Sequence, residues 1–308
     1  MELMFYGVRG SYPTSRKDQI AYGGNTTCFH FRSKAGQDLV MDAGSGIRKL
    51  GHRMMGREFG KGEGHLPIII GHTHWDHIMG LPFFHPMYID GNEFTFVSAG
   101  QTDQGIRDIL SGQYRDLHFP VALELIPAKV EFEDFAPGDK FELNGFHISS
   151  IQLNHQGITV GYRIEADGGS AVIFTDTARI TEVRLGDGMG GPDPDAAHAA
   201  RFTAGLREFC ADADVVVHDS HFFEHEMVGR YHWGHSTIED AIDLCKASRV
   251  KNLFLFHHAP EHWDIQVDAK LALARDLSRR ESFNIFAAAE GWKLDVAAET
   301  NYWLEATS

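Results

Sequence analysis

The sequence has few cysteines and no long apolar run. Its three cysteines are far apart and odd in number, which argues against a disulfide framework and a thiolate metal site; we expect them to be reduced and mostly buried. No stretch approaches the ~18 apolar residues that a membrane-spanning helix needs. The first ten residues also lack the basic and then apolar pattern of a signal peptide. We therefore expect a cytoplasmic protein that does not bind membranes.

Positive charge is also scarce. Lys and Arg number 28 against 43 Asp and Glu, which gives a formal net charge of −15 at pH 7. Because non-specific binding to phosphates depends on clustered Lys and Arg, long RNA or DNA is a poor candidate partner. The 19 histidines suggest a metal that binds imidazole well, rather than calcium or magnesium, which prefer oxygen ligands.

Short apolar runs recur along the chain, and six of them end in a carboxylate or an imidazole. Such runs, bounded by Gly, Pro or charged residues, are typical of buried strands. In α/β enzymes the reactive groups lie on loops at the carboxyl ends of strands, so one shared site is the economical interpretation. The residues in question are Asp42, His72, His155, Asp176, His218 with Asp219, and His257.

Between these runs the sequence predicts five helices, and the second half alternates strand and helix. The first forty residues and the stretch 121–161 are richer in strands and turns, which predicts mixed sheets rather than a doubly wound parallel one. No linker or repeat is evident. The predicted helices are Gly46–Arg57, Gln104–Ser111, Asp195–Asp212, Ile238–Ala247 and Val267–Arg280.

The segment from residue 72 to 77 carries four potential metal ligands in six positions, directly after a predicted strand: His72, His74, Asp76 and His77. Two imidazoles two residues apart suit one cation, while the Asp and the adjacent His can turn to a second. Ligand sets of His and carboxylate without Cys favour zinc, with manganese and iron as alternatives. The segment therefore predicts a site for two divalent metal ions.

This pattern resembles the metallo-β-lactamase superfamily, whose signature is His-x-His-x-Asp-His followed by a distant His, an Asp and a final His. The resemblance spans nearly the whole chain and implies one domain, 1–308, with a four-layer αβ/βα sandwich. It implies that one metal is held by His72, His74 and His155. The other would be held by Asp76, His77 and His257, with Asp176 bridging and Asp42 in a supporting position.

Two of these assignments have competitors. His155 competes with His147 and His118, but it alone closes an apolar strand and precedes a glycine. His257 directly follows the strand Leu253–Phe256, which leaves His258 as a supporting partner, or as the ligand if the register is shifted by one.

The motif Gly-His-Ser-Thr at 234–237 resembles that of ribonuclease Z and related phosphodiesterases. A local alternative is a capping box in which Ser236 and Glu239 begin the next helix. Capping does not explain His235, which could donate a proton to a departing oxygen, as the resemblance implies. The start of the chain, Gly7-Val8-Arg9-Gly10-Ser11 with Tyr22-Gly23-Gly24-Asn25-Thr26, looks like the opening of a bacterial phosphodiesterase-like group. That group also includes phosphoribosyl cyclic phosphate phosphodiesterases, and Arg9 is a candidate phosphate ligand. Glycine turns between edge strands are an equal alternative there.

The resemblance implies a phosphodiesterase in which a hydroxide held between two metals attacks phosphorus. Asp76 would orient or deprotonate that water and His235 would protonate the leaving alkoxide. No basic arm like that of tRNA-processing ribonuclease Z is evident, the nearest candidate, 186–194, being short and acidic. A small or cyclic phosphodiester is therefore the expected substrate, and a homodimer is a further expectation.

Other function classes remain open at this point. A thioester or other acyl hydrolase of the glyoxalase II type shares the ligand set but should lack Gly-His-Ser-Thr. An oxygen- or nitric-oxide-reducing iron protein would carry Glu at position 74 and a flavin domain, and a non-catalytic regulatory protein would have lost ligands. Among weaker candidates, Asp219 could support the site, and Trp75 and His85 could line it. His221 and His225 are interpreted as structural or surface residues.

Overall fold

Fourteen strands of the computed structural model form two seven-stranded sheets. The structure describes residues 1–100, 104–115, 117–179 and 196–298. The first sheet runs in the order β14 (Lys293–Asp295), β1 (Glu2–Gly7), β2 (Cys28–Arg32), β3 (Asp38–Met41), β4 (His65–Ile70), β5 (Glu93–Ala99) and β6 (Lys129–Phe135). The second runs in the order β13 (Asn284–Ala287), β12 (Asn252–Phe256), β11 (Val215–Asp219), β10 (Gly169–Phe174), β9 (Val160–Ala166), β8 (Phe146–Gln152) and β7 (Lys140–Leu143).

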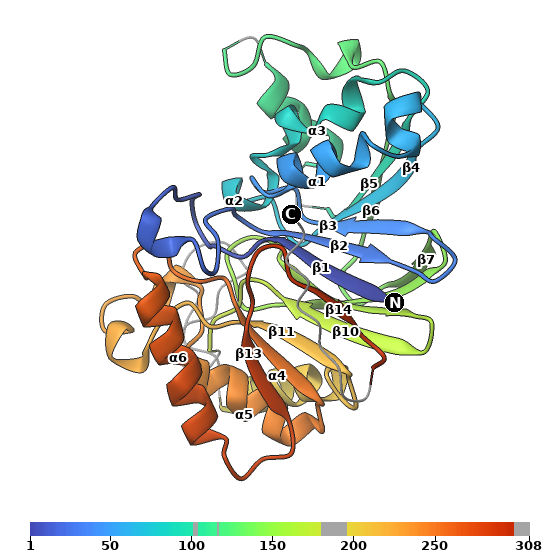
Figure 1. The fold of residues 1–308 in the computed structure, drawn as a ribbon. Helices are drawn as coiled ribbons and strands as arrows, with labels where there is room; N and C mark the ends of the chain where they lie inside the picture. The colour runs from blue at the N-terminus through green and yellow to red at the C-terminus, as the bar shows by residue number, and fades with distance from the viewer. Residues whose placement is uncertain (101–103, 116, 180–195, 299–308) are drawn as a thin grey trace.

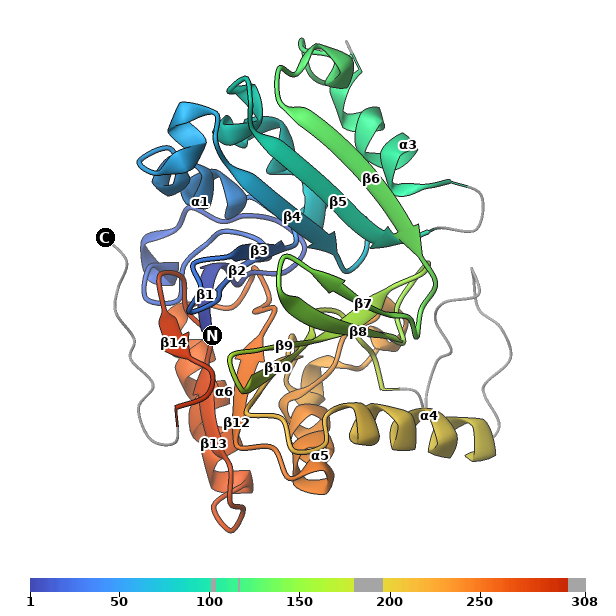
Figure 2. The same cartoon turned by 90° about the vertical axis from the view of Figure 1, so that its right-hand side faces the viewer.

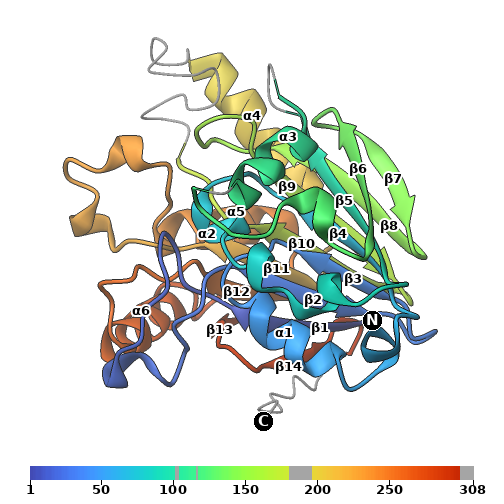
Figure 3. The same cartoon turned by 90° about the horizontal axis from the view of Figure 1, so that it is seen from above.

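Helices cover the outer face of each sheet, so the molecule has four layers (Figures 1 and 2). Viewed from above, α1 and α3 lie over the first sheet (Figure 3). The principal helices are α1 (Ile47–Met54), α2 (Trp75–Ile78), α3 (Ile106–Ser111), α4 (Ala196–Phe209), α5 (Ile238–Ser248) and α6 (Asp264–Leu277). The predicted αβ/βα sandwich is confirmed.

The core is divided into layers by the alternation of side chains along the strands. Phe5 and Phe29 of the first sheet pack against Phe254 and Phe256 of the second, where Phe29 and Phe256 have ring centroids 4.7 Å apart. Separate clusters lie under the helices of each outer face. Burial of these apolar faces, at about 25 cal/mol per Å², holds the two sheets together.

Each sheet is mixed, as the sequence predicts. β1, β2 and β3 pair antiparallel, whereas β3, β4, β5 and β6 pair parallel; in the second sheet β7 to β10 are antiparallel and β10 to β13 are parallel. Parallel neighbours end at the same edge of a sheet, which brings the loops after β3, β4, β10, β11 and β12 to one end of the sandwich.

All five predicted helices exist, with shifted ends. The largest shift is in the last, which spans Asp264–Leu277 instead of starting at Val267, because the Gln266 side chain accepts from the backbone N–H of Trp263 and starts the helix earlier. The third predicted helix, 195–212, is α4, which ends at Phe209. Position 195 and the acidic 186–194 segment lie outside the described residues.

The cysteines are free and buried, as predicted. Among the described residues, none of the helices combines the length and apolar character that crossing a bilayer requires.

Candidate metal centre

The segment 72–77 turns from β4 into the short helix α2, and this turn points several side chains toward one place. β4 ends at Ile70, and α2 begins at Trp75, with His74 in an extended conformation at its N-cap. His72, Asp76 and His77 are buried, whereas His74 is exposed. Because the chain changes from strand to helix within four residues, several side chains of this segment can face the same point.

Three imidazoles form the first cluster. The ligating atoms of His72, His74 and His155 lie within 4.8 Å of one another. The His155 ring donates through Nδ1 to the carbonyl of Gly234 at 2.9 Å, which leaves Nε2, 3.1 Å from the Nδ1 of His74, as a lone-pair donor for a cation. Burial lowers the pKa of His155 to about 3, so this ring is neutral at ordinary pH.

The second cluster contains both carboxylates. Ligating atoms of Asp76, His77, Asp176 and His257 lie within 4.8 Å of one another. Asp176 places Oδ1 3.2 Å from His257 Nε2 and Oδ2 3.0 Å from His77 Nε2. The same carboxylate reaches toward the first cluster, with Oδ1 4.0 Å from His72 Nε2. The position of Asp176 between the clusters fits the predicted bridging role.

Two buried polar atoms at this centre have no hydrogen-bond partner within the part of the chain that the structure describes. They are the two ring nitrogens of His72. A buried polar atom without a partner costs about 1–3 kcal/mol, and such atoms are normally satisfied by protein, water or an ion. Convergent imidazole and carboxylate donors are the set that divalent transition metals prefer. The residues therefore fit metal ions.

Asp42 supports the second cluster from behind. Its Oδ2 lies 2.7 Å from Nδ1 of His77, and its Oδ1 accepts from the N–H of Gly71 at 2.8 Å. A carboxylate on Nδ1 fixes the ring and directs Nε2 toward the site. This geometry fits the supporting position that the sequence assigns to Asp42.

His235 lies beside the centre and is held by Asp219. Nδ1 of His235 is 2.9 Å from Oδ2 of Asp219, at the end of β11. His235 also belongs to a group with His155 and Asp176 whose ligating atoms converge. A ring fixed through Nδ1 can present Nε2 to a substrate. The two residues therefore have the geometry predicted for a proton donor and its support.

The predicted capping box is off by one residue. Thr237, not Ser236, is the N-cap of α5, and Asp240 takes the place expected for Glu239. Ser236 instead donates from Oγ to the carbonyl of Thr177, the residue after Asp176. The serine thus ties the His235 loop to the loop of the bridging carboxylate.

His221, interpreted from the sequence as a structural or surface residue, lies against the candidate centre. It is buried, it stacks on His235 at 4.3 Å between centroids, and its Nδ1 lies 2.9 Å from the carbonyl oxygen of His257. It shares no helix face with His225, which lies exposed in a 3-10 turn. The sequence could have indicated this position, because His221 follows Asp219 by two residues at the end of a predicted strand.

Arg9 is structural, which favours the alternative of glycine turns over a phosphate contact. Its side chain is fully buried, and Nε and Nη1 donate to the carbonyls of Gly23, Ala259 and His262. The adjacent glycine turn packs on the centre instead: a Cβ on Gly10 would lie 2.4 Å from the His257 ring. The next residue, Ser11, donates its N–H to Asp76 at 2.7 Å.

His258 points away from the two clusters. Its Nε2 donates to the carbonyl of Ala288, and its ring packs edge-on against Tyr22. His147 and His118, the competitors of His155, are exposed. Trp75 is 70% exposed beside the centre, and His85 is exposed at the start of a 3-10 turn. Among the described residues, neither Trp75 nor His85 belongs to a convergent group of ligating side chains.

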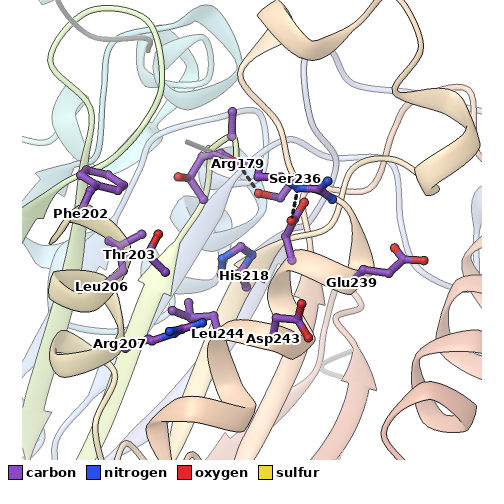
Figure 4. A pocket seen from close by; sticks show the side chains of 13 residues that line it. Arg179, Phe202, Thr203, Leu206, Arg207, His218, Ser236, Glu239, Asp243 and Leu244 are labelled. Atoms are coloured by element: carbon purple, nitrogen blue, oxygen red, sulfur yellow. Dashed lines mark hydrogen bonds and ion pairs between the residues drawn. The ribbon is translucent and has the colours of Figure 1, made fainter. Parts of the chain in front are cut away.

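A separate hollow is lined in part by Thr177 and Ser236, the residues that follow Asp176 and His235 (Figure 4). It has a volume of about 380 Å³. Apolar side chains of α4 and α5, Phe202, Leu206 and Leu244, form one wall. Arg179 is paired with Asp240 and Glu224 on the other side. The hollow adjoins the centre without contributing to either metal cluster.

A family model described as "Beta-lactamase superfamily domain" matches residues 38–258. A ribonuclease Z of Halalkalibacterium halodurans is 23% identical over 294 residues, which cover 86% of this chain and 90% of that protein.

Two solved structures share the fold. The short form of human tRNase Z has a TM-score of 0.62 at 17% identity and covers 97% of this chain and 100% of its own. A diphosphatase of the PhnP family has a TM-score of 0.62 at 18% identity, with 99% of both chains covered.

The expectation that long nucleic acid is a poor partner is wrong. It was drawn from the net charge, whereas the related sequences are ribonucleases. A whole-chain charge does not determine binding at one face, since the Debye length is only ~8 Å at physiological salt and distant charges are screened.

Proposed function

The chain belongs to the beta-lactamase superfamily, and we propose that it hydrolyses phosphodiesters at a centre that holds two divalent metal ions. It is a metal-dependent phosphoric diester hydrolase. The observation that carries the two-metal proposal is the pair of convergent clusters, since Asp176 belongs to the second and its Oδ1 lies 4.0 Å from His72 Nε2 of the first.

His72, His74 and His155 would hold one ion, and Asp76, His77 and His257 the other, with Asp176 between them. Zinc suits this donor set best, and manganese or iron are the alternatives. When bound, such ions activate water for attack on phosphorus and neutralise the charge that develops on the phosphate.

The chain's own residues would orient the attacking water and protonate the leaving alkoxide. Asp76, whose Oδ2 accepts from the Ser11 N–H, is positioned to orient the attacking water. His235 would give a proton to the leaving alkoxide, a step that is worth about 100- to 10,000-fold when the leaving group is poor. Asp219 would keep the His235 ring in the orientation that presents Nε2.

One phosphodiester is the unit on which this chemistry acts. We propose that small and cyclic diesters are therefore substrates, and that a diester in a longer RNA chain meets the same groups. In this proposal the centre determines which bond is hydrolysed, and the surrounding surfaces determine how long a substrate can bind.

The first test measures hydrolysis of bis(p-nitrophenyl) phosphate, a 2′,3′-cyclic nucleotide, a precursor tRNA and a simple thioester. Each is assayed before and after chelation and after zinc or manganese is restored. We expect chelator-sensitive cleavage of the diesters and none of the thioester. Cleavage of the thioester alone would instead assign the chain to the acyl hydrolases.

The second test concerns His235. His235→Ala should slow a diester with an alkoxide leaving group by about 100-fold or more, while a nitrophenolate, which leaves without a proton, is slowed far less. His147→Ala, at an exposed histidine outside the metal clusters, is the control. Equal losses for both leaving groups would remove His235 from the role of acid.

A further inference from the structure

The hollow between α4 and α5 lies directly behind the loops of the candidate centre. Its volume is about 380 Å³, and three of the residues that line it are chain neighbours of residues at the centre. They are Thr177 beside Asp176, Ser236 beside His235, and His218 beside Asp219. Since adjacent Cα atoms are about 3.8 Å apart, a contact made in the hollow acts one peptide unit away from the centre.

The end of β11 separates the hollow from the centre. His218 and Asp219 are the last two residues of this strand, and successive side chains of a strand point to opposite faces. Asp219 faces His235, with Oδ2 2.9 Å from Nδ1. His218 instead reaches into the hollow (Figure 4). The hollow is therefore a cavity of its own and not an extension of either metal cluster.

Three polar side chains of the hollow each have an acceptor atom without a partner in the part of the chain that the structure describes. Oγ1 of Thr177 and Oε2 of Glu239 are buried and form no hydrogen bond. His218 donates from Nδ1 to the carbonyl of Asp219, which leaves the lone pair of Nε2 without a donor. Burial lowers the pKa of His218, so the ring is neutral and Nε2 can accept. Because buried polar groups are nearly always satisfied, these three atoms indicate a ligand that donates hydrogen bonds.

The charges that line the hollow favour a cation. Three carboxylates and two guanidinium groups are present. Arg179 is already paired with Asp240, at 2.6 Å. Arg207 and Asp243 are exposed, where water weakens the interactions of their charges. Glu239 is thus the carboxylate that a ligand inside the hollow would meet.

The opposite wall is apolar. It is formed by Phe202 and Leu206 of α4 and by Leu244 of α5. In Figure 4, Phe202 and Leu206 lie across the hollow from Glu239. A ligand that fits both walls has a positively charged hydrogen-bond donor at one end and an apolar body at the other.

We propose that this hollow binds a primary ammonium group that carries an apolar chain, and that the bound amine acts on the neighbouring metal centre. An ammonium group has three N–H donors and no acceptor, which matches the three unpartnered acceptors. Glu239 supplies the opposite charge and makes the hydrogen bond stronger than one between neutral groups. The chain of the amine would be buried against the side chains of α4 and α5.

The bound amine would act through Thr177. The N–H of Thr177 donates to Oδ2 of Asp219 at 3.2 Å, and its carbonyl accepts from Oγ of Ser236. A ligand that holds the Thr177 side chain therefore restrains the adjacent Asp176 together with the loop of His235. Because coupling between two sites is reciprocal, the amine and the metals should strengthen each other's binding.

The first test measures binding to the metal-loaded protein by calorimetry at neutral pH. The probes are hexylammonium, hexyltrimethylammonium and 1-hexanol. The second keeps the charge without an N–H donor, and the third keeps the chain without the charge. We expect hexylammonium to bind at least about 10-fold more tightly than either, as a hydrogen bond between charged groups gives. No binding of hexylammonium at millimolar concentrations, or equal binding of all three probes, would overturn the proposal.

Two variants locate the binding site. Glu239→Gln removes the charge at nearly constant size and should weaken hexylammonium binding about 10-fold. Thr177→Val removes one acceptor and should weaken it by a smaller factor. The matched control is Glu208→Gln, which makes the same change at an exposed residue of α4 outside the hollow. Unchanged affinity in Glu239→Gln, or an equal loss in the control, would show that the amine binds elsewhere.

The last test measures the action on the centre without any turnover. Saturating hexylammonium should raise the chelator concentration that removes half of the metal by about 5-fold, the lower end of ordinary coupling between sites. The effect should be lost in Glu239→Gln and kept in Glu208→Gln. Amine binding that leaves metal retention unchanged would refute the action on the centre. Because neither measurement depends on hydrolysis, both results could hold even if the protein cleaved no diester, in which case only the proposed function would fail.

Discussion

The two ligand clusters are built from the same residue type but have opposite electrostatics. In the three-histidine cluster, burial lowers the pKa of His72 and His74 as well as that of His155. In the other, burial works in the same direction on His77 and His257, but nearby carboxylates, Asp176 foremost, raise the pKa of both above the ordinary value. The first cluster thus offers neutral rings, each with one nitrogen lone pair available, and the second holds rings that stay protonated to higher pH and must lose a proton to bind a metal.

The difference shows that the neighbours of a histidine determine whether its ring is neutral and can bind a metal. Imidazole binds metal only when neutral, so metal affinity depends on pH wherever the ring is protonated. The carboxylates that attract a cation to the second cluster are the same groups that keep its histidines protonated without one. The predictions below test this contrast, from the largest expected effect to the smallest.

Loss of Asp176 should affect both clusters at once. Asp176→Asn removes the charge that faces His77, His257 and His72. We expect diester hydrolysis to fall below detection and bound metal to fall by more than one equivalent per chain. Metal analysis and activity are measured together, with circular dichroism as the control for folding. A variant that keeps two equivalents and full activity would rule out the bridging role.

Single-ligand changes should separate the clusters. His74→Ala and His77→Ala are each expected to lower bound metal by about one equivalent, because each removes a donor from a different cluster. Spectra of the cobalt-substituted protein should show different remaining signals in the two variants. If the two spectra were identical, the clusters would not be independent sites.

Asp42→Asn should weaken only the second cluster. It removes the carboxylate on Nδ1 of His77, and loss of such a partner typically costs 10- to 100-fold in metal affinity. Asp38→Asn is the matched control, since Asp38 makes a similar buried contact to His30, 2.8 Å long, on the neighbouring strand. In a chelator titration, the metal of the second cluster should be removed at a lower chelator concentration from Asp42→Asn. The concentration needed for Asp38→Asn should stay unchanged.

The smallest effect is the order in which acid removes the metals. The pKa of His77 is raised well above the ordinary value of about 6.5, so protons compete with its metal as pH falls through that raised value, before the ordinary value is reached. The first cluster, with its lowered values, keeps its metal to more acidic pH. Metal release followed by a fluorescent indicator should occur in two steps, with the second cluster emptied first. Simultaneous release of both metals would contradict the proposed difference between the two clusters.

Much of the candidate centre could be predicted because it is encoded locally. Strands that end in His or Asp follow from short apolar runs, and the segment 72–77 is dense enough to stand out without a structure. The same reasoning assigned Asp42 and Asp219 to supporting positions, and the structure places both in contact with site histidines.

The errors came where the outcome depends on contacts distant in sequence. Arg9 looked available for phosphate, but three carbonyls from two distant loops enclose it. His221 looked ordinary until β11 and β12, paired in parallel, brought it beside His257. The net charge made long nucleic acid look a poor partner because it sums over the whole chain, whereas binding depends on the charges near one face.

The sequence by itself determined the strands, the helices and the chemical identity of the ligands, since these depend on periodicity and on residue type within a few positions. Only the tertiary structure decided which imidazoles are neutral, that Arg9 is enclosed by backbone carbonyls and that His221 lies beside His257. The physical reason is that burial and electrostatic interaction depend on distance in space, and loops from both sheets meet at this centre.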